Sequence, residues 1–303
     1  MRVLLAIAVF GIAICSFAGL LAPFWWFFDL FNHFRVQGAV AALVALALAV
    51  AFDRRLAVIA AGSLLLNVGL IGLRLFETGG VPADAVGQPV ALVATNVLSS
   101  NRDHAAVLAM IAAERPDILV VTELSPAWAA ALSVTAGDFP YRLQHPRADN
   151  FGIALYARRP FKGQVLASGR FGLPLIVAEF DGFMLIAAHP FPPISTETAS
   201  ENRVYLADVA NIARAANLPV VLAGDLNASL WSHSIYPLFD AGLTRVSSSG
   251  IAYTWPVGML PLAIHIDHVL VKGLRAGQFR VLAGVGSDHF PVRADLVITQ
   301  SAR

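Results

Sequence analysis

The first 75 residues of the chain consist of three long apolar runs separated by short polar segments. The first run, at residues 3–28, carries no charged side chain, and further runs follow at residues 36–52 and 56–73. A helix of about 20 apolar residues crosses the roughly 30 Å hydrocarbon core of a membrane. The pattern therefore predicts three membrane-spanning helices within residues 1–75.

A cleaved signal peptide is an alternative interpretation of the first run, with Arg2 as its charged flank. The run is longer than the apolar core of a signal peptide, and no clear small-residue cleavage site follows it. A second alternative keeps one or two spanning helices and buries the remaining apolar hairpin. The strong hydropathy of all three runs favours three spans.

The basic residues between the apolar runs predict how the helices are oriented. Lys and Arg in short loops prefer the cytoplasmic side of a membrane. Arg2, Arg54 and Arg55 fall on one side, and Arg35 and Arg74 fall on the other. Because Arg54 and Arg55 form the tightest basic cluster, we place the N-terminus in the cytoplasm. Three crossings then put the rest of the chain outside the cytoplasmic membrane.

Residues 76–89 are rich in Gly and Pro and follow the last apolar run. This composition is typical of a linker, and a stretch of this length reaches ~50 Å at most when extended. The remaining residues, 90–303, are enough for one domain with a substantial core. The predicted organisation is a membrane region at 1–75, a linker at 76–89 and a domain at 90–303.

Beyond residue 90, short apolar runs that end on polar residues alternate with helical patterns. Strands are predicted at residues 90–97, 117–124, 151–158, 175–180, 183–190, 219–227, 265–272 and 289–298, and helices at 102–116 and 196–217. Some strands are separated by helices, whereas others follow one another like hairpins. The pattern predicts an α/β sandwich with mixed sheets rather than a purely parallel sheet.

Polar residues stand at the ends of most of these strands. They are Asn96, Glu123, His189, Asp225, Asn227, Asp267, Asp288 and His289. A single polar residue at a strand end is usually a turn or cap residue. As a set, however, carboxylates and amides can hold a hard cation such as Mg²⁺, and imidazoles and amides can donate hydrogen bonds to phosphate oxygens. If the strand ends share one crevice, the set predicts a site for phosphate chemistry.

The order of short motifs along the chain resembles a known family. The motifs read TNV, VVTEL, AAHP, AGDLNAS, IDHVLV and GSDHFPV, and NFGIALYARRP at residues 150–160 fits the same series. They resemble, over residues 90–297, the endonuclease/exonuclease/phosphatase superfamily, which has the fold of DNase I and exonuclease III. The resemblance implies a two-sheet α/β sandwich of the DNase I type and hydrolysis of phosphate esters.

The resemblance also implies a role for each matching residue in metal binding. Asn96 and Glu123 help to bind a divalent cation, with Glu123 as the direct carboxylate ligand. Asp288 supports the metal or the adjacent loop. The cation implied is Mg²⁺, with Mn²⁺ as an alternative. Charge neutralisation by such an ion suits attack on a phosphate ester.

The remaining matching residues are implied to act on water and on the phosphoryl group. Asp225 orients or deprotonates the attacking water, while Asn227 and His189 contact phosphoryl oxygens. His289, oriented by Asp267, stabilises the transition state as a hydrogen-bond donor or proton shuttle.

Two further residues have both a functional and an ordinary interpretation. Arg203, in the predicted helix 196–217, is a candidate for binding a substrate phosphate, but an arginine on a helix surface is the ordinary alternative. Trp255 precedes the strand of Asp267 and either flanks the pocket or packs in the core.

The chain departs from the family pattern at two positions. Thr122 stands where many relatives carry Gln, and His268 follows Asp267 where nucleases often have an aromatic residue. The second departure resembles a membrane-attached bacterial branch whose members pair a few spanning helices with an exported catalytic domain. This departure weakens an assignment of DNA as the specific substrate.

Composition and charge narrow the choice of substrate. Hydrophobic residues make up 57% of the chain and charged residues 14%, which is more apolar than a soluble globular protein. From residue 81 onward, 16 basic residues oppose 17 acidic ones, and a nearly neutral domain is a poor match for non-specific binding of duplex DNA. The single cysteine, Cys15, excludes a disulfide framework within the chain.

The sequence thus predicts a multi-pass, membrane-anchored, metal-dependent phosphoesterase with its site outside the cytoplasmic membrane. Its partners would be the membrane and a phosphate-ester substrate, for which a lipid-linked phosphate is our first choice. One alternative is an exported nuclease, because Arg142, Arg147, Arg158 and Arg159 could form a local patch for nucleic acid. The other is a non-catalytic binding module of the cell envelope.

Overall fold

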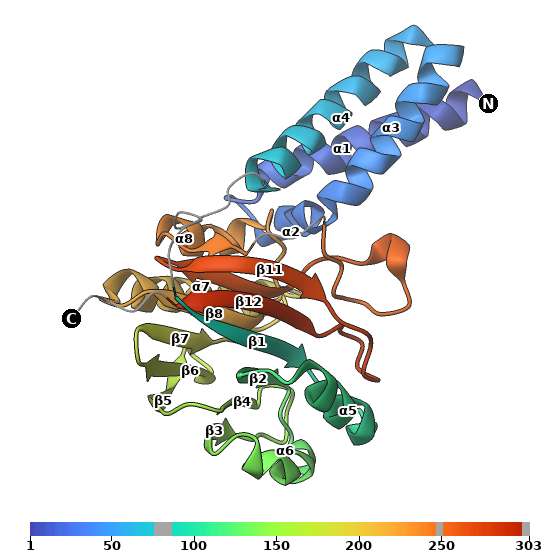
Figure 1. Ribbon diagram of the computed structural model, residues 1–303. Helices are drawn as coiled ribbons and strands as arrows, with labels where there is room; N and C mark the ends of the chain where they lie inside the picture. Colours follow the sequence, from blue (N-terminus) through green and yellow to red (C-terminus); the bar gives the residue numbers. More distant parts are fainter. Residues whose placement is uncertain (76–86, 247–250, 299–303) are drawn as a thin grey trace.

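The computed structural model describes residues 1–75, 87–246 and 251–298. Three long helices stand together above a domain built from two β-sheets (Figure 1). The predicted linker at 76–89 lies mostly outside the described residues, and its last two residues, Gln88 and Pro89, already belong to the first strand.

The three long helices are α1 (Arg2–Ala18), α3 (Arg35–Phe52) and α4 (Arg54–Leu75), and we call them the bundle. The apolar stretches that contain them have mean hydropathies of 2.6, 2.0 and 2.2, and they are long enough to cross a membrane. Many large apolar side chains on their outer surfaces are exposed, such as Leu43 at 55% and Leu65 at 72%. Such surfaces suit contact with lipid rather than water.

The first helix ends earlier than the apolar run predicts. Helix α1 and the short 3-10 helix η1 (Gly19–Leu21) end before Pro23, whose ring removes a backbone donor from the helical ladder. Residues 22–34, which we call the connector, then form α2 (Trp26–Asp29) and the 3-10 helix η2 (Leu30–Phe34) before α3 begins. The predicted span of 3–28 is therefore too long, because its last aromatic residues belong to the connector.

The described part of the domain contains two six-stranded mixed sheets. The first has the order β11 (Arg275–Val281), β12 (Val292–Ile298), β1 (Gln88–Asn96), β2 (Ile118–Thr122), β4 (Ile153–Ala157) and β3 (Tyr141–His145). The second has the order β5 (Phe161–Ser168), β6 (Leu173–Phe180), β7 (Phe183–Ala187), β8 (Val220–Asp225), β10 (Asp267–Lys272) and β9 (Thr244–Arg245). Neighbouring strands are antiparallel except for the parallel pairs β1–β2 and β7–β8.

The sheets pack face to face, and helices cover their outer faces. Leu92 and Ile118 of the first sheet share the central core with Leu185 and Val221 of the second. Helices α5 (His104–Glu114) and α6 (Pro126–Leu132) cover the first sheet, and α7 (Thr196–Ala215) and α8 (Tyr236–Asp240) cover the second. Because both faces of the inner strands are buried, β1 and β8 read as continuous apolar runs. The predicted mixed-sheet α/β sandwich is confirmed.

The sequence pattern did not indicate β3, β5, β9, β11 or α6. Strands β3, β5, β9 and β11 lie at the sheet edges, and β3 (YRLQH) and β5 (FKGQVLAS) carry several exposed residues. An edge strand buries fewer side chains and can therefore carry a more polar sequence than an inner one. Hydrophobic periodicity indicated the inner strands because these strands bury more side chains and therefore have more apolar sequences.

The connector and the first turn of α3 make direct hydrogen bonds to the sheet domain. The indole N–H of Trp26 donates to Oγ1 of Thr196 at 2.8 Å, and the amide of Gln37, in the first turn of α3, donates to the carbonyl of Ala263 at 2.7 Å. Between them, the buried Asp29 carboxylate accepts hydrogen bonds of 2.7 Å from the Ser232 hydroxyl and from the backbone N–H of residue 233. The bundle and the domain are therefore in direct contact, and not joined by residues 76–89 alone.

Candidate active site

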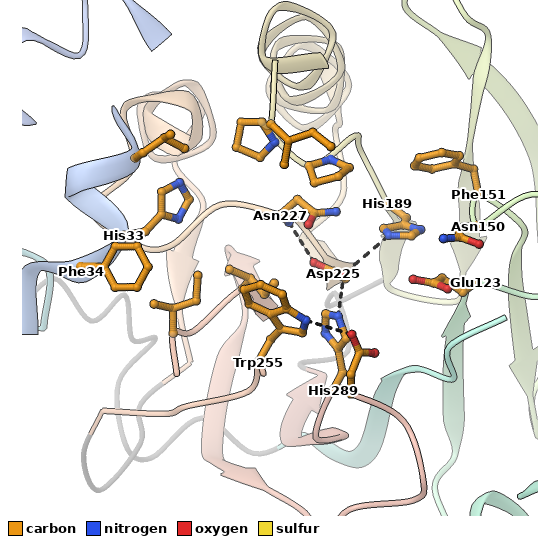
Figure 2. A pocket seen from close by; sticks show the side chains of 17 residues that line it. His33, Phe34, Glu123, Asn150, Phe151, His189, Asp225, Asn227, Trp255 and His289 are labelled. Carbon is orange, nitrogen blue, oxygen red and sulfur yellow. Dashed lines mark hydrogen bonds and ion pairs between the residues drawn. The ribbon is translucent and has the colours of Figure 1, made fainter. Parts of the chain in front are cut away.

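The polar residues predicted at the strand ends gather at one edge of the two sheets. Asn96 is the last residue of β1 and pairs with Thr122 of β2, after which Glu123 follows. Asp225 ends β8 and lies opposite Asp267, the first residue of β10. Glu123 and Asp225 line a cavity of about 410 Å³ together with His189, Asn227, Asp288 and His289 (Figure 2).

Asp225 lies between two imidazoles at the base of this cavity. Its Oδ2 atom is 3.5 Å from Nε2 of His189 and 3.6 Å from Nε2 of His289. On the far side of His289, Nδ1 lies 2.9 Å from Oδ2 of Asp267. All four side chains are buried, so their charges act on one another with little screening by water.

The charges in this cluster shift its protonation equilibria. Burial opposes ionisation of Asp225, but His289 and His189 outweigh it and hold the pKa of this carboxyl below its usual range. Burial likewise disfavours the imidazolium, but Asp267 and Asp225 raise the pKa of His289 to about 10. Burial raises the pKa of Asp267, and the negative charge of Asp225 raises it further. The attraction of His289 lowers this pKa but does not outweigh the effect of burial. The cluster therefore stabilises an ionised Asp225 beside a protonated His289.

Asn96 holds two carboxylates in place. Its amide nitrogen lies 3.0 Å from Oε1 of Glu123 and 3.1 Å from Oδ2 of Asp225, while its carbonyl accepts from the backbone N–H of Leu98 at 2.9 Å. The other Glu123 oxygen accepts from the backbone N–H of Ser99 at 2.9 Å. In this structure Asn96 positions Glu123 and Asp225 relative to each other, and its proposed contact with a metal remains a prediction.

Two glycines allow the close backbone contacts that the site requires. Gly224 has a φ of +141°, and a Cβ there would lie 2.1 Å from the carbonyl oxygen of Ala188. A Cβ at Gly152 would lie 2.0 Å from the carbonyl oxygen of Leu124, next to Glu123. Side chains at either position would push the strand ends apart. Glu123 itself has a φ of +58°, a conformation that is uncommon outside glycine and often found at functional sites.

His189 and Asn227 are fixed by backbone contacts from the elements around them. The hydroxyl of Tyr205, on α7, accepts from the backbone N–H of His189 at 3.1 Å and donates to the Pro174 carbonyl at 2.8 Å. The amide of Asn227 donates to the Pro190 carbonyl at 3.0 Å. The segments that follow β7 and β8 are thereby joined, which brings His189 and Asn227 to the same cavity.

A cluster of potential metal ligands lies within the site. Ligand atoms of Asp225, Asp267 and His289 lie within 4.8 Å of one another. This set differs from the predicted set of Asn96, Glu123 and Asp288. A cation among the three would compete with the proton that His289 shares with Asp267.

The carboxylates of the predicted set also fit a hard cation. Asp288 accepts from the indole N–H of Trp255 at 3.0 Å through Oδ2, whereas its buried Oδ1 has no hydrogen-bond partner among the described residues. Glu123 and Asp288 line the same cavity. Carboxylate oxygens that face a cavity are the usual ligands of Mg²⁺, so the side chains of Glu123 and Asp288 have the donor chemistry that a divalent cation needs.

The structure also places at the cavity residues to which the sequence assigned no definite role. Asn150 and Phe151 line the cavity, and Oδ1 of Asn150 accepts from the Ser99 hydroxyl at 2.6 Å. Trp255 also lines it, which favours the pocket interpretation of that residue. Arg203 is a half-buried residue of α7 and is not among the described residues that line the cavity, so its role in phosphate binding remains a prediction.

The connector contributes the least expected part of the wall. Leu30, His33 and Phe34 line the same cavity as His189 and Asp225. In Figure 2, His33 and Phe34 lie on one side of Asp225, and Glu123 and Asn150 lie on the other. No sequence motif indicated these residues, because their signal was an aromatic segment that also suits a loop at a membrane surface.

A family comparison and a search of curated proteins gave different results. A model of the Endonuclease/Exonuclease/phosphatase family matches residues 93–289. The matched segment includes all the residues predicted for the site. No curated protein matched the chain.

Solved structures with a similar fold match this chain over almost the whole of their own length. They include TDP2 from D. rerio complexed with a single-strand DNA product, at 16% identity and a TM-score of 0.58, covering 69% of this chain and 99% of that one. The 3′ phosphatase NExo from Neisseria, bound to a product DNA hairpin, has 21% identity and a TM-score of 0.57, covering 68% and 99%. Beta toxin from Staphylococcus aureus with bound magnesium ions has 15% identity and a TM-score of 0.55, again covering 68% and 99%. These likenesses confirm the DNase I-like fold.

Proposed function

Because the chain belongs to the endonuclease/exonuclease/phosphatase family, we propose that it is a Mg²⁺-dependent phosphoesterase that hydrolyses a lipid-linked phosphate ester at the outer side of the cytoplasmic membrane. Residues 1–75 anchor the enzyme in the membrane and residues 90–303 carry out catalysis. The observation that carries the lipid-linked substrate is that the connector between two apolar helices forms one wall of the active-site cavity.

The residues around Asp225 have the properties that attack of water on a phosphate ester requires. A carboxylate with a low pKa is a weak base, so Asp225 orients the attacking water more than it removes its proton. His289, held in its protonated form by Asp267, donates from Nε2 to a phosphoryl oxygen as negative charge develops there. His189 and Asn227 bind the remaining phosphoryl oxygens on the side of α7.

A divalent cation would be held by Glu123 and Asp288, with Asn96 keeping Glu123 in place. When bound, the cation neutralises phosphate charge and polarises the phosphorus–oxygen bond. Mg²⁺ is our first choice because the available ligand atoms are oxygens, and Mn²⁺ is the alternative. A magnesium-bound structure among the similar proteins, that of beta toxin, supports this choice.

The surface near the cavity suits a membrane. Among the described residues of the domain, several of the most exposed large apolar side chains are Ile194 at 76%, Leu260 at 69% and Met259 at 51%. They lie close in sequence to Thr196, which bonds to Trp26 of the connector, and to Ala263, which bonds to Gln37 of α3. If the bundle spans the membrane, these loops reach its interface, where exposed apolar side chains are stabilised by lipid.

An exported nuclease is the second candidate, since two of the similar structures contain DNA products. The predicted arginine patch gives it limited support. Arg147 forms an ion pair with Asp149 at 2.6 Å, and Nε of Arg158 donates to the Pro116 carbonyl at 2.9 Å. An arginine whose charge is offset by a carboxylate, as that of Arg147 is, neutralises fewer phosphates along a DNA strand.

The test is a direct competition between substrates. Full-length protein in liposomes should cleave a lipid phosphate ester faster per site than single- or double-stranded DNA, with Mg²⁺ present and at ~0.15 M salt, where loose electrostatic binding is screened. A clear preference for DNA would contradict the lipid-linked substrate and favour an exported nuclease. Absence of any metal-dependent hydrolysis would favour the non-catalytic binding module.

A further inference from the structure

Of the three connector residues that line the cavity, only His33 carries a hydrogen-bonding side chain. Leu30 and Phe34 are apolar, whereas the His33 imidazole lies between them in sequence and is 6% exposed. Figure 2 shows His33 beside Phe34, across Asp225 from Glu123. It therefore lies at the end of the cavity opposite the candidate metal ligand Glu123, where the organic part of a phosphate ester would extend.

The hydrogen bonds of His33 define which of its nitrogens carries the proton. Its Nδ1 atom accepts from the backbone N–H of Ser229 at 3.4 Å. A backbone N–H only donates, so Nδ1 presents a lone pair and the neutral ring carries its hydrogen on Nε2. Nε2 is buried and has no partner among the residues that the structure describes. His33 thus lines the cavity and carries an unused donor on Nε2.

The position of this donor is fixed by contacts on both sides. Ser229, which holds Nδ1, lies two residues beyond Asn227 of the phosphate site. Asp29, four residues before His33, is anchored by the Ser232 hydroxyl and the N–H of residue 233. A buried donor held in place without an acceptor is rare in native proteins, because it loses its hydrogen bonds to water and gains none. A ligand oxygen is the partner that would satisfy it.

The walls around the donor are apolar. Leu30 and Phe34 of the connector face the same cavity as Ile194, Ile264 and Ile266 of the domain. A fully charged or strongly hydrated group would lose water in such a place without compensation. The matching ligand is an oxygen acceptor attached to an otherwise apolar molecule.

We propose that His33 is a substrate-binding residue supplied by the membrane region: its Nε2–H donates to an oxygen in the organic part of a membrane-borne phosphate ester, beside an apolar wall of Leu30 and Phe34. This inference rests on the proposed function, because it takes the phosphate site at Asp225 as given. It adds that the enzyme selects lipid-linked esters through the connector.

Two amide substitutions test the roles of the two His33 nitrogens separately. In His33→Asn, the amide reaches about as far as Nδ1, so the bond to Ser229 is kept and the donor toward the cavity is lost. In His33→Gln, the longer amide places a donor near the position of Nε2. Full-length protein in mixed micelles with Mg²⁺ is assayed on dioleoyl phosphatidylglycerol, phosphatidylethanolamine and phosphatidic acid, and on soluble methyl p-nitrophenyl phosphate. The same two changes at His145, an exposed residue that ends β3, are the control.

The expected result is a difference between the two variants on the cleaved lipid. His33→Asn should lower kcat/KM for the lipid about 10-fold more than for the soluble ester, mainly through KM, while His33→Gln stays within about 3-fold of the wild type. The reverse order, with Gln impaired and Asn active, would show that His33 only docks the connector on Ser229, and equal activity of all variants would also overturn the inference.

The wild type serves to separate this inference from the proposed function. If the wild type cleaves the soluble ester but none of the lipids, the lipid part of the proposed function fails, and the role of His33 fails with it. If it cleaves a lipid while both variants match it, only the role of His33 fails. Thermal unfolding of each variant in the same micelles distinguishes a loss of folded protein from a loss of substrate binding.

Discussion

Oδ2 of Asp267 lies 2.9 Å from Nδ1 of His289, and this contact turns the other nitrogen of the ring toward Asp225. The carboxylate fixes a hydrogen on Nδ1 and stabilises the positive charge of the ring. Because the two residues come from β10 and from the segment before β12, the contact also joins the two sheets at the site. Asp267 and His289 should therefore act as one unit.

We expect Asp267→Asn and His289→Ala to lower kcat by similar factors, about 100-fold or more. An imidazole without its orienting carboxylate loses both its geometry and its preferred protonation state, so little function remains for the second change to remove. The double variant should be hardly slower than either single variant. Steady-state kinetics on one phosphodiester measures all three, and fully additive losses would show that the residues act independently.

The pH dependence of the reaction should report the pKa of His289. That pKa is raised by Asp267 and Asp225 against the effect of burial, and the ring donates to phosphate only when protonated. Activity is therefore present below this pKa and lost as the pH rises through it. Asp267→Asn removes one of the charges that favour protonation, so the alkaline limb of kcat/KM should move to lower pH. An alkaline limb that stays in place would mean that Asp267 does not act through the charge of His289. Asp240→Asn, an exposed change on α8, is the control.

The sequence was sufficient to predict that these polar residues gather at one edge of the sheets, because they lie at strand ends. Buried strands such as β1 and β8 are recognisable as apolar runs, and Asn96 and Asp225 end them. The hydrogen bonds from Asn96 to both Glu123 and Asp225 could not be predicted, since they depend on the register between β1 and β2 and on the packing of the two sheets. The sequence pattern predicts which residues lie at the edge of a sheet, but it does not predict the distances between their side chains.

Two substitutions should distinguish the possible metal ligands. Glu123→Gln should lose most activity through weakened cation binding and should recover part of it at high Mg²⁺. Asp225→Asn should lose activity at all Mg²⁺ concentrations while cation affinity is largely kept, because the proposed role of Asp225 is to orient the attacking water. Titration calorimetry and kcat as a function of Mg²⁺ concentration measure the two effects. Near wild-type turnover of Asp225→Asn at saturating Mg²⁺ would refute its role, and a strong loss of affinity would assign the cation to the cluster of Asp225, Asp267 and His289.

The orientation of the bundle is testable with reporter fusions. A reporter that is active only outside the cytoplasm should be active after residue 303 and inactive when placed within residues 53–55. A reporter that is active only inside should give the opposite pattern at both places. If instead both patterns are inverted, the catalytic domain lies in the cytoplasm and the proposed outer location is wrong.

The connector shows where sequence reasoning fell short. Its aromatic residues continue the first apolar run, and periodicity alone cannot tell the end of a spanning helix from an apolar segment that packs on another domain. Asp29, Asn32 and His33 are its polar residues. Ser232 and Ser229, the partners of Asp29 and His33 in the domain, lie about 200 residues away. Only the folded chain brings these pairs together, so the contribution of the connector to the cavity was not predictable.

Asp29 should couple the bundle to the catalytic domain. Its buried carboxylate accepts from the Ser232 hydroxyl and the N–H of His233 at 2.7 Å each, and Asp29→Ala would remove both of these bonds. We expect the variant to lose about 1–3 kcal/mol of unfolding free energy, measured by denaturant unfolding in detergent. It should also lose more activity toward lipid esters than toward a soluble ester, because the wall that carries His33 is no longer held on the cavity. Asp240→Ala, which removes an exposed carboxylate from the adjacent α8, should change stability by less than about 0.5 kcal/mol. Equal losses on both esters would mean that Asp29 supports the fold as a whole and does not position the connector at the site.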